Sequence, residues 1–432
     1  MICRISKATP LIFPEYQRWH LLFSRVFVIL DTNIFHGVNM YQRAIFSRLT
    51  DLLRQQKSIL LLGPRQTGKT TLARSLQLDL DISLIRPQLR QEYETNPDSL
   101  IGKIEALAAT MTQKPLVLLD EVQKVPLLLD VVQDLIDRKV AQFILTGSSA
   151  RKLRRASQDI NLLPGRVIKL HMDPLSIQEL PPVRCNLDFL LAYGSLPNIV
   201  SAESEALIAE ELEAYASIYL EEEVRQEAVV RNISKFTKFL QLAAIESGRV
   251  INFTKISQQL GVAPPTIQEY FTILVDCLVA EEIKPLTKTR TRNRLVKSSK
   301  YLFFDLGIRR ICAKEGVNYP ESYRGYIFEQ FIGLELLRFK HLSKPQMMLY
   351  FWKVHDGPEV DWVVELEGEY IPIEVKLAKT PSLQKDTKHL TTFLAEYPNA
   401  KRAYIICTCD YPIKLSDKII ALPWQRMLEL FQ

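Results

Sequence analysis

The chain lacks the features that mark several classes of protein. Its six cysteines form no CxxC pair and no series of close spacings, which argues against a disulfide framework and against a structural zinc site. No stretch reaches the roughly 18 apolar residues that a membrane span needs. The nearest candidate, residues 21–30, is short and interrupted by Arg25. We therefore expect a cytoplasmic protein with reduced thiols and no membrane partner.

A strong net charge is also missing. The formal charge is +6 over 432 residues, so overall charge gives no argument for nucleic-acid binding. The charge is unevenly distributed: residues 203–227 are acidic, whereas residues 284–300 are rich in lysine and arginine and contain no acid. At roughly 100 to 200 residues per domain, the length predicts two to four domains.

The start of the chain has little sign of a packed structure. Residues 1–39 are expected to be a leader outside the fold, or to derive from an upstream start codon. Met40 opens an amphipathic pattern, "MYQRAIFSRLTDLL", that leads into the first strong strand. The first folded domain is therefore expected to span residues 40–200.

The stretch "SILLLGPRQTGKTTLARSL" is an apolar run, then GxxxxGKT, then a helical pattern. A strand followed by a glycine-rich loop and a helix N-terminus is what phosphate binding requires, because backbone N–H groups wrap the phosphates there. Lys69 is expected to reach the β- and γ-phosphates of ATP, with a catalytic role, and Thr70 to hold Mg²⁺. The expected nucleotide-binding residues are Gly63, Pro64, Arg65, Gln66, Thr67, Gly68, Lys69, Thr70, Thr71 and Asp120.

A second acidic motif follows the strand "PLVLL". Asp120 is expected to contact Mg²⁺ through water or Thr70, and Glu121 to polarise the attacking water, so hydrolysis of ATP is expected as well as binding. Thr146 and Ser148, at the end of the strand in "FILTGSS", could contact the γ-phosphate or the water. A helix N-cap role for Ser148 or Ser149 at the same strand end is the alternative.

Apolar strands alternate with helical stretches through this region. That order predicts an α/β fold of the P-loop NTPase kind, with a parallel sheet covered by helices on both faces. Nucleotide is expected at the carboxyl ends of the strands. Arg166 precedes a further strand and is a candidate sensor or finger for the γ-phosphate, in its own chain or in a neighbouring subunit; a surface ion pair is the alternative.

Five stretches carry a family resemblance: "GPRQTGKTT", "LLDEVQKVP", "LTGSSA", "GRVIKLHMDPLSIQEL" and "YGSLPNIV". Together they resemble bacterial and archaeal AAA+-type ATPases that carry a C-terminal domain of unknown function with a restriction-endonuclease-like core. The resemblance runs from about Met40 to the C-terminus and implies ATP binding.

The region of residues 201–300 is predicted to be a helical lid and a winged-helix-like module. A helix, a second helix, a turn at Gly261, a third helix and a strand follow one another. The residues expected to form its core are Ile256, Leu260, Ile267, Phe271, Leu274 and Leu278. The third helix exposes no lysine or arginine, which argues against its binding in a DNA major groove lined by phosphates. The basic residues follow later, in residues 284–300. Phosphate contact by that basic run and a merely solvated loop are both open.

Residues 301–432 are predicted to form a C-terminal α/β domain with a hairpin of charged strands. "EVDWVVEL" and "YIPIEVKL" flank the turn Glu367-Gly368, and that register places Asp361 opposite Glu374. Like charges at paired positions destabilise a sheet, so the pair calls for a cation. Lys376 projects from the same face as Glu374. Glu359 is expected to oppose Lys376, and water-facing charges on an edge hairpin are the alternative.

An Asp followed by Glu-x-Lys on the next strand is the arrangement of metal-dependent nucleases. The domain resembles the PD-(D/E)xK superfamily, and the resemblance implies that Glu329 on the preceding helix is a further metal ligand. The proline that normally precedes the aspartate is replaced by Val360. The expected cofactor of this site is a second Mg²⁺, or Mn²⁺.

The leading hypothesis is an ATPase whose nucleotide state controls a nuclease-like, DNA-binding C-terminal domain. The alternative is a regulatory NTPase switch whose C-terminal domain is catalytically inactive and binds protein. ATP is the expected ligand; nucleic acid, a protein partner and a second copy of the chain are open.

Overall fold

The computed structural model describes residues 41–149, 163, 165–220, 233–287 and 295–431. Residues Gln42–Gln432 form one compact unit. The predicted leader and the middle of the basic run, residues 288–294, lie outside the described residues.

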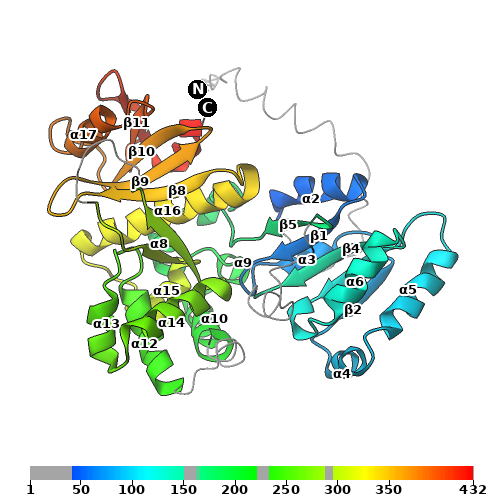
Figure 1. Cartoon of the computed structure of the whole chain (residues 1–432). Coiled ribbons are helices and arrows are strands. Elements are labelled where there is room, and N and C mark those ends of the chain that lie inside the picture. The colour runs from blue at the N-terminus through cyan, green and yellow to red at the C-terminus, as the bar shows by residue number, and fades with distance from the viewer. Residues whose placement is uncertain (1–40, 150–162, 164, 221–232, 288–294, 432) are drawn as a thin grey trace, which may run out of the picture. The chain divides into compact units, whose positions relative to one another are not determined.

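Five parallel strands form the first sheet, in the order β2-β3-β4-β1-β5 (Figure 1). The strands are β1 (Ser58–Leu62), β2 (Leu80–Ser83), β3 (Leu116–Asp120), β4 (Gln142–Gly147) and β5 (Val167–His171). The helices of this part are α2 (Ile45–Arg54), α3 (Lys69–Arg74), α4 (Pro87–Thr95), α5 (Ser99–Ala109) and α6 (Leu128–Asp137). The predicted α/β class with a parallel P-loop-type sheet is confirmed.

Helices cover both faces of this sheet, as strand β1 illustrates. Leu60 and Leu62 point into a core shared with α4, α5 and α6, whereas Ile59 and Leu61 point into a core shared with α2. Side chains alternate between faces along a strand, so a strand that is apolar at every position must be buried on both sides. The continuous apolar run before the glycine-rich loop is thus explained.

A helical region follows. Its helices are α8 (Leu187–Tyr193), α9 (Pro197–Ser201), α10 (Glu205–Ala214), α12 (Ile233–Ile245), α13 (Phe253–Leu260), α14 (Pro264–Asp276) and α15 (Leu306–Ala313). Five of the six residues expected in its core are buried there: Ile256, Leu260, Ile267, Phe271 and Leu274. The expectation for the sixth, Leu278, was wrong. It follows α14 in the left-handed conformation, with a φ of 58°. The chain turns there, and the Leu278 side chain packs against the core of the first sheet.

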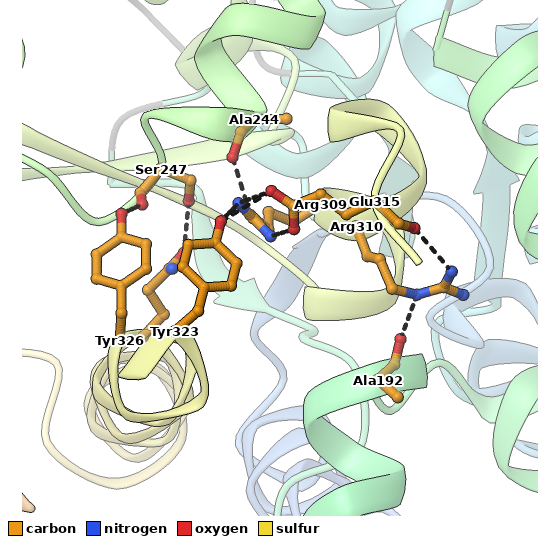
Figure 2. A network of polar contacts seen from close by, with 9 residues as sticks. Ala192, Ala244, Ser247, Arg309, Arg310, Glu315, Tyr323 and Tyr326 are labelled. Carbon is orange, nitrogen blue, oxygen red and sulfur yellow. Dashed lines mark hydrogen bonds and ion pairs between the residues drawn. The ribbon is translucent and has the colours of Figure 1, made fainter. Parts of the chain in front are cut away.

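The buried side chain of Arg309 links two helices of this region to the helix that follows them (Figure 2). Arg309 on α15 donates to the carbonyl of Ala244 on α12 at 2.9 Å and to the carboxylate of Glu315 at 2.9 Å. It also donates to the hydroxyl of Tyr323 on α16 (Glu321–Ser343) at 2.5 Å. A buried guanidinium is tolerated only when its donors are paired, and here they are shared between three elements.

The second sheet has eight strands in the order β12-β13-β11-β10-β9-β8-β6-β7 and is mixed. The strands are β6 (Ala280–Pro285), β7 (Lys300–Phe303), β8 (Met348–Lys353), β9 (Glu359–Leu366), β10 (Glu369–Lys376), β11 (Ala403–Cys407), β12 (Ile413–Lys414) and β13 (Ile419–Pro423). Strands β6 and β7 are antiparallel, and β6 also pairs with β8. Strands β6 and β7 are therefore part of this sheet, and the expected domain boundary at 300/301 falls within β7.

Helix α16 packs on one face of the second sheet at Gly333. A side chain there would meet the ring of Trp362 on β9, with a built Cβ only 2.5 Å from Cζ2. Helix α17 (Lys388–Glu396) brings Leu390 and Phe393 into a separate core with Trp352 of β8. The close approach at Gly333 brings α16 onto the charged hairpin.

Candidate functional site

The glycine-rich loop joins β1 to α3 at the carboxyl edge of the first sheet. Gly63 has no room for a side chain, because a built Cβ would lie 2.2 Å from the carbonyl oxygen of Met172. Gly68 has a φ of 93° and precedes the first residue of α3. The Thr67 hydroxyl donates to the carbonyl of Pro64 at 2.9 Å, which closes the loop on itself. Both glycines thus meet a backbone requirement that other residues do not.

Lys69 is buried and held by the loop that it follows. Its Nζ donates to the carbonyls of Gly63 at 2.8 Å and Pro64 at 2.7 Å. An ammonium confined beside the loop N–H groups makes a concentrated positive site, which suits phosphate. Of the other predicted loop residues, Arg65, Gln66 and Thr70 are half-buried and Thr71 is exposed.

Arg43 supports this loop from a distant part of the sequence. Its guanidinium donates to the carbonyl of Thr67 at 2.5 Å, to that of Asp173 at 2.7 Å, and to the carboxylate of Glu179 at 3.0 Å. Sequence reasoning missed Arg43, because nothing in an amphipathic pattern 20 residues before the motif indicates such a contact.

Asp120 ends β3 beside the loop and is fully buried. One carboxylate oxygen accepts from the hydroxyls of Thr70 at 2.6 Å and Thr146 at 2.7 Å, and the other accepts from Ser83 at 3.3 Å. All three donors are neutral hydroxyls, so no cation among the described residues offsets this carboxylate through a hydrogen bond. Asp120 and Thr70 fit Mg²⁺, which takes oxygen ligands.

Thr146 stands at the end of β4 beside the acidic pair. Its hydroxyl donates to Asp120 and accepts from the backbone N–H of Glu121 at 3.0 Å. Thr146 therefore positions the acidic pair, and its contact with the γ-phosphate or the water stays a prediction. Ser83 was missed, since it lies at the end of a short strand with no motif.

Glu121 stands directly after Asp120 in the left-handed conformation, with a φ of 60°. Its carboxylate accepts from the Ser148 hydroxyl at 3.0 Å and from the side-chain amide of Gln123. A non-glycine residue at positive φ is uncommon and aims the carboxylate away from the strand direction. The Ser148 hydroxyl therefore orients Glu121; the N-cap alternative concerns residues from 150 onward, outside the described ones.

Arg166 lies at the amino end of β5, at the edge of the sheet opposite the glycine-rich loop. Its guanidinium makes hydrogen bonds of 2.8 to 3.0 Å with the carboxylate of Asp137. This bond raises the pKa of Arg166 and lowers the pKa of Asp137. The prediction of a γ-phosphate sensor in the same chain does not fit this position. The alternative, a surface ion pair, describes the structure.

The charged hairpin has the predicted register. Glu369 pairs with Leu366 and Ile373 with Trp362, around a turn in which Glu367 and Gly368 have φ values of 53° and 82°. Two central residues at positive φ match the twist of a tight hairpin. Asp361 lies beside the start of the ladder, where its carboxylate accepts from the N–H of Val375 at 2.8 Å.

Asp361 and Glu374 are close enough to perturb each other. Burial raises the pKa of Asp361 well above its usual range, and the charges of Glu329 and Glu374 raise it further. Burial also raises the pKa of Glu374, against the attraction of Lys376. One oxygen of Glu374 accepts from Lys376 at 2.6 Å, whereas the other is buried and has no hydrogen-bond partner in the part of the chain that the structure describes. An unpartnered buried carboxylate oxygen fits a cation.

Lys300, which sequence reasoning missed, lies against the same cluster. Its Nζ donates to Glu329 at 2.9 Å and lies 5.0 Å from the ring centroid of Trp362. Burial lowers the pKa of Lys300, but Glu329 and Asp361 outweigh this effect and raise it. Glu329 is therefore engaged by an ammonium group, which corrects the expectation that it completes a three-carboxylate site.

Glu359 departs from expectation in a similar way. It forms an ion pair with Lys353 on β8 and not with Lys376, because Lys353 is its cross-strand partner.

The backbone of Glu329 is held by Trp362, whose indole N–H donates to the carbonyl of Glu329 at 3.1 Å. Within the described ranges, Glu329, Asp361 and Glu374 do not converge as one three-ligand group.

No helix in the described part of the chain has the length and apolar character that crossing a membrane would need.

Comparison with protein families assigns the first sheet and its motifs. Residues 55–181 match the model of an AAA domain. Residues 184–317 and 324–427 match two domains of unknown function, DUF8612 and DUF4143. The chain therefore contains an AAA-type P-loop ATPase domain, which agrees with the ATPase part of the resemblance in the sequence.

Two curated relatives align along most of the chain. The uncharacterized protein Rv2008c of Mycobacterium tuberculosis is 26% identical over 396 residues, covering 90% of this chain and 84% of that protein. The uncharacterized protein MJ1637 of Methanocaldococcus jannaschii is 24% identical over 421 residues, covering 87% and 85%.

Similar solved structures include a Walker-type ATPase of Pyrococcus abyssi, with a TM-score of 0.45, 14% identity and coverage of 63% of this chain and 96% of that one. DnaA of Aquifex aeolicus bound to AMPPCP has a TM-score of 0.27, 12% identity and coverage of 56% and 89%.

Proposed function

We propose that this protein binds and hydrolyses ATP with Mg²⁺, and that its nucleotide state controls a nuclease-like C-terminal module. The observation that carries the first part is the arrangement at the loop: Lys69 beside the loop N–H groups, Asp120 held by three hydroxyls, and Glu121 oriented next to it. Lys69 follows β1, and Asp120 and Glu121 stand at the end of β3, so these elements meet at one edge of the sheet.

The residues of the loop have distinct tasks in this proposal. Arg65 to Gly68 present backbone N–H groups to the phosphates, and Lys69 turns from the loop carbonyls to the phosphate charge. Thr70 and Asp120 hold the magnesium ion, which neutralises phosphate charge when bound. Glu121 accepts the proton of the attacking water, and the Ser148 hydroxyl keeps its carboxylate in place.

Helix α16 supports the coupling part of the proposal. It carries Glu329 beside the charged hairpin and, about 14 Å further along at 1.5 Å per residue, Arg338. Arg338 donates to the carbonyl of Leu175 at 3.0 Å, and Glu335 accepts from the N–H of Ile177 at 3.1 Å. Both partners follow β5, whose end packs on the phosphate loop. One helix thus lies against the hairpin and against the segment that follows β5, so a shift at the loop can reach the hairpin through that segment.

At the hairpin, the proposal assigns a Mg²⁺ or Mn²⁺ ion to Asp361 and Glu374, with Lys376 beside it. The unpartnered oxygen of Glu374 supports this assignment. The ion would activate water for attack on a phosphodiester. Nucleic acid is the substrate class that follows.

A second candidate function is favoured by Lys300. Because this lysine already neutralises Glu329, the hairpin can be stable without a metal ion. In that case the C-terminal domain binds a protein partner or a second copy of the chain, and the ATPase acts as a switch without cleavage.

Plasmid nicking by the full chain with Mg²⁺ or Mn²⁺, with and without ATP, separates the two functions. The proposal expects metal-dependent nicking that ATP changes, that is lost in Glu374→Ala and Lys376→Ala, and that persists in Glu367→Gln, an exposed acid on the same hairpin. Lys69→Ala should lose ATP binding and the effect of ATP. Absence of nicking with either metal, while Lys69→Ala still abolishes ATP hydrolysis, would replace the nuclease part with the switch.

A further inference from the structure

A second group of ligand-type side chains lies where α16 meets the first sheet. His171 is the last residue of β5, Asp173 follows two residues later, and His341 lies in the last turn of α16. Their side chains are largely buried, with exposed fractions of 13%, 17% and 14%. None of the three belongs to the nucleotide loop or to the charged hairpin.

The imidazoles of His171 and His341 both contact the carboxylate of Asp173. His171 Nε2 lies 3.3 Å from one oxygen of Asp173, and His341 Nδ1 lies 3.0 Å from the other. The ring centroids are 4.2 Å apart. The ligand atoms of the three residues all lie within 4.8 Å of one another, which holds for no other group of three His, Cys, Asp or Glu residues in the described ranges. Glu281 Oε1 is 4.0 Å from His341 Nε2 and offers a further oxygen.

This set of donors has the character of a transition-metal site. Zn²⁺ binds imidazole nitrogen and carboxylate oxygen at about 2.0 to 2.2 Å, so neighbouring ligands of a tetrahedral ion lie about 3.4 Å apart. The two nitrogen–oxygen separations are close to that value. Two imidazoles disfavour Mg²⁺ and Ca²⁺, which prefer oxygen ligands alone.

We infer that His171, Asp173 and His341 bind a divalent transition-metal ion, with Zn²⁺ as the reference case, that fastens α16 to the end of β5. Met172, between two of the ligands, packs its carbonyl against Gly63 and its side chain 3.4 Å from a Cβ built at Gly68. The ion therefore lies directly behind the phosphate loop. It connects the loop to the helix that contacts the charged hairpin.

Zinc titration of the metal-free full chain, without nucleotide, tests this site. The wild type should bind one equivalent at micromolar free zinc or below, and His171→Gln and His341→Gln should each weaken binding by at least about tenfold. His355→Gln is the matched control: His355 also faces an aspartate, Asp356, at 2.7 Å, but it is exposed. Zinc should raise the melting temperature of the wild type and of the control, and less so that of the two variants.

X-ray absorption of the zinc-loaded wild type gives a result that does not depend on a variant folding. Two imidazole nitrogens and no sulfur in the coordination shell are expected. Sulfur ligands would move the ion to the neighbouring thiols of Cys407 and Cys409, whose sulfurs lie 3.1 Å apart, and would overturn the inference. So would a wild type that binds no zinc, or variants that bind it as tightly as the control does. The three side chains would then be held together only by the hydrogen bonds of His171 and His341 to Asp173.

Discussion

Two sites of buried acid, at Asp120 and at the charged hairpin, differ in the partners that stabilise them. At the first sheet, Asp120 is surrounded by the hydroxyls of Thr70, Thr146 and Ser83, which satisfy its oxygens without adding charge. At the hairpin, ammonium groups engage the acids: Lys300 binds Glu329 and Lys376 binds Glu374.

This difference separates a site that needs a cation from one that can be stable without it. Hydroxyl donors hydrogen-bond a carboxylate without supplying a positive charge, which leaves that role to a metal ion. Lysine partners supply the opposite charge themselves, and the attraction between the pair offsets part of the cost of burial. A metal ion at the hairpin has to compete with two lysines, whereas a magnesium ion at Asp120 has no such competitor among its hydrogen-bond partners.

The largest effect is expected from Glu121→Gln. Loss of the base should lower kcat for ATP hydrolysis by about 10²- to 10⁴-fold while ATP binding is retained. Steady-state hydrolysis and equilibrium binding of labelled ATP measure the two quantities. Glu92→Gln, an exposed acid on α4, is the control and should hydrolyse ATP as the wild type does. Normal turnover in Glu121→Gln would contradict the assignment of the base.

The next largest effect is expected from Lys300→Met, on the free energy of unfolding. It leaves Glu329 as a buried charge without its partner, which typically costs about 3 to 5 kcal/mol of unfolding free energy. Added Mn²⁺ should recover part of that loss, because the freed carboxylate can then bind the ion. Denaturant unfolding with and without Mn²⁺ measures both. Lys297→Met, an exposed lysine nearby, should change neither. If the variant is as stable as the wild type and Mn²⁺ does not change its unfolding free energy, the acids do not form a cation site.

Asp361→Asn should stabilise the protein at neutral pH. The pKa of Asp361 is raised in the folded state, chiefly by burial, so the stability that this carboxyl contributes is present at low pH. It is lost as the pH rises from the unfolded value of about 3.9 through the raised folded pKa, and each unit of the shift costs about 1.4 kcal/mol above it. Denaturant unfolding across this pH range should show a smaller decline for the variant. Asp410→Asn, an exposed aspartate, should follow the wild-type curve.

The smallest effect is expected from Arg166→Ala. Exposed ion pairs contribute little, so kcat should change by about twofold or less, as in Arg54→Ala, which breaks another exposed pair with Asp51. ATP hydrolysis at several protein concentrations is the measurement. A large loss of kcat that appears only where subunits associate would restore Arg166 as a finger acting on a neighbour.

Local patterns were the dependable part of the prediction. The glycine-rich loop, the acidic strand end and the two-residue turn at Glu367-Gly368 each depend on residues close in the sequence, so one sequence is enough to predict them. The hairpin register followed from the turn alone, since each pair of partners is fixed once the turn is placed.

Contacts over long distances in the chain could not be predicted in this way. Arg43 reaches the phosphate loop, Lys300 reaches Glu329, and His341 reaches Asp173 across 168 residues. No spacing rule connects such residues, because only the packing of α16 and of the two sheets brings them together. The wrong core assignment of Leu278 has the same origin.

The sequence by itself determined that this chain has a phosphate-binding loop, an acidic pair beside it, a parallel sheet covered on both faces, and a hairpin with paired acids. Tertiary structure alone decided which side chains lie against the buried acids: neutral hydroxyls at Asp120, lysines at the hairpin, and two histidines at Asp173. The physical reason is that periodicity and turn chemistry act over a few residues, whereas the balance of a buried charge depends on every element packed around it.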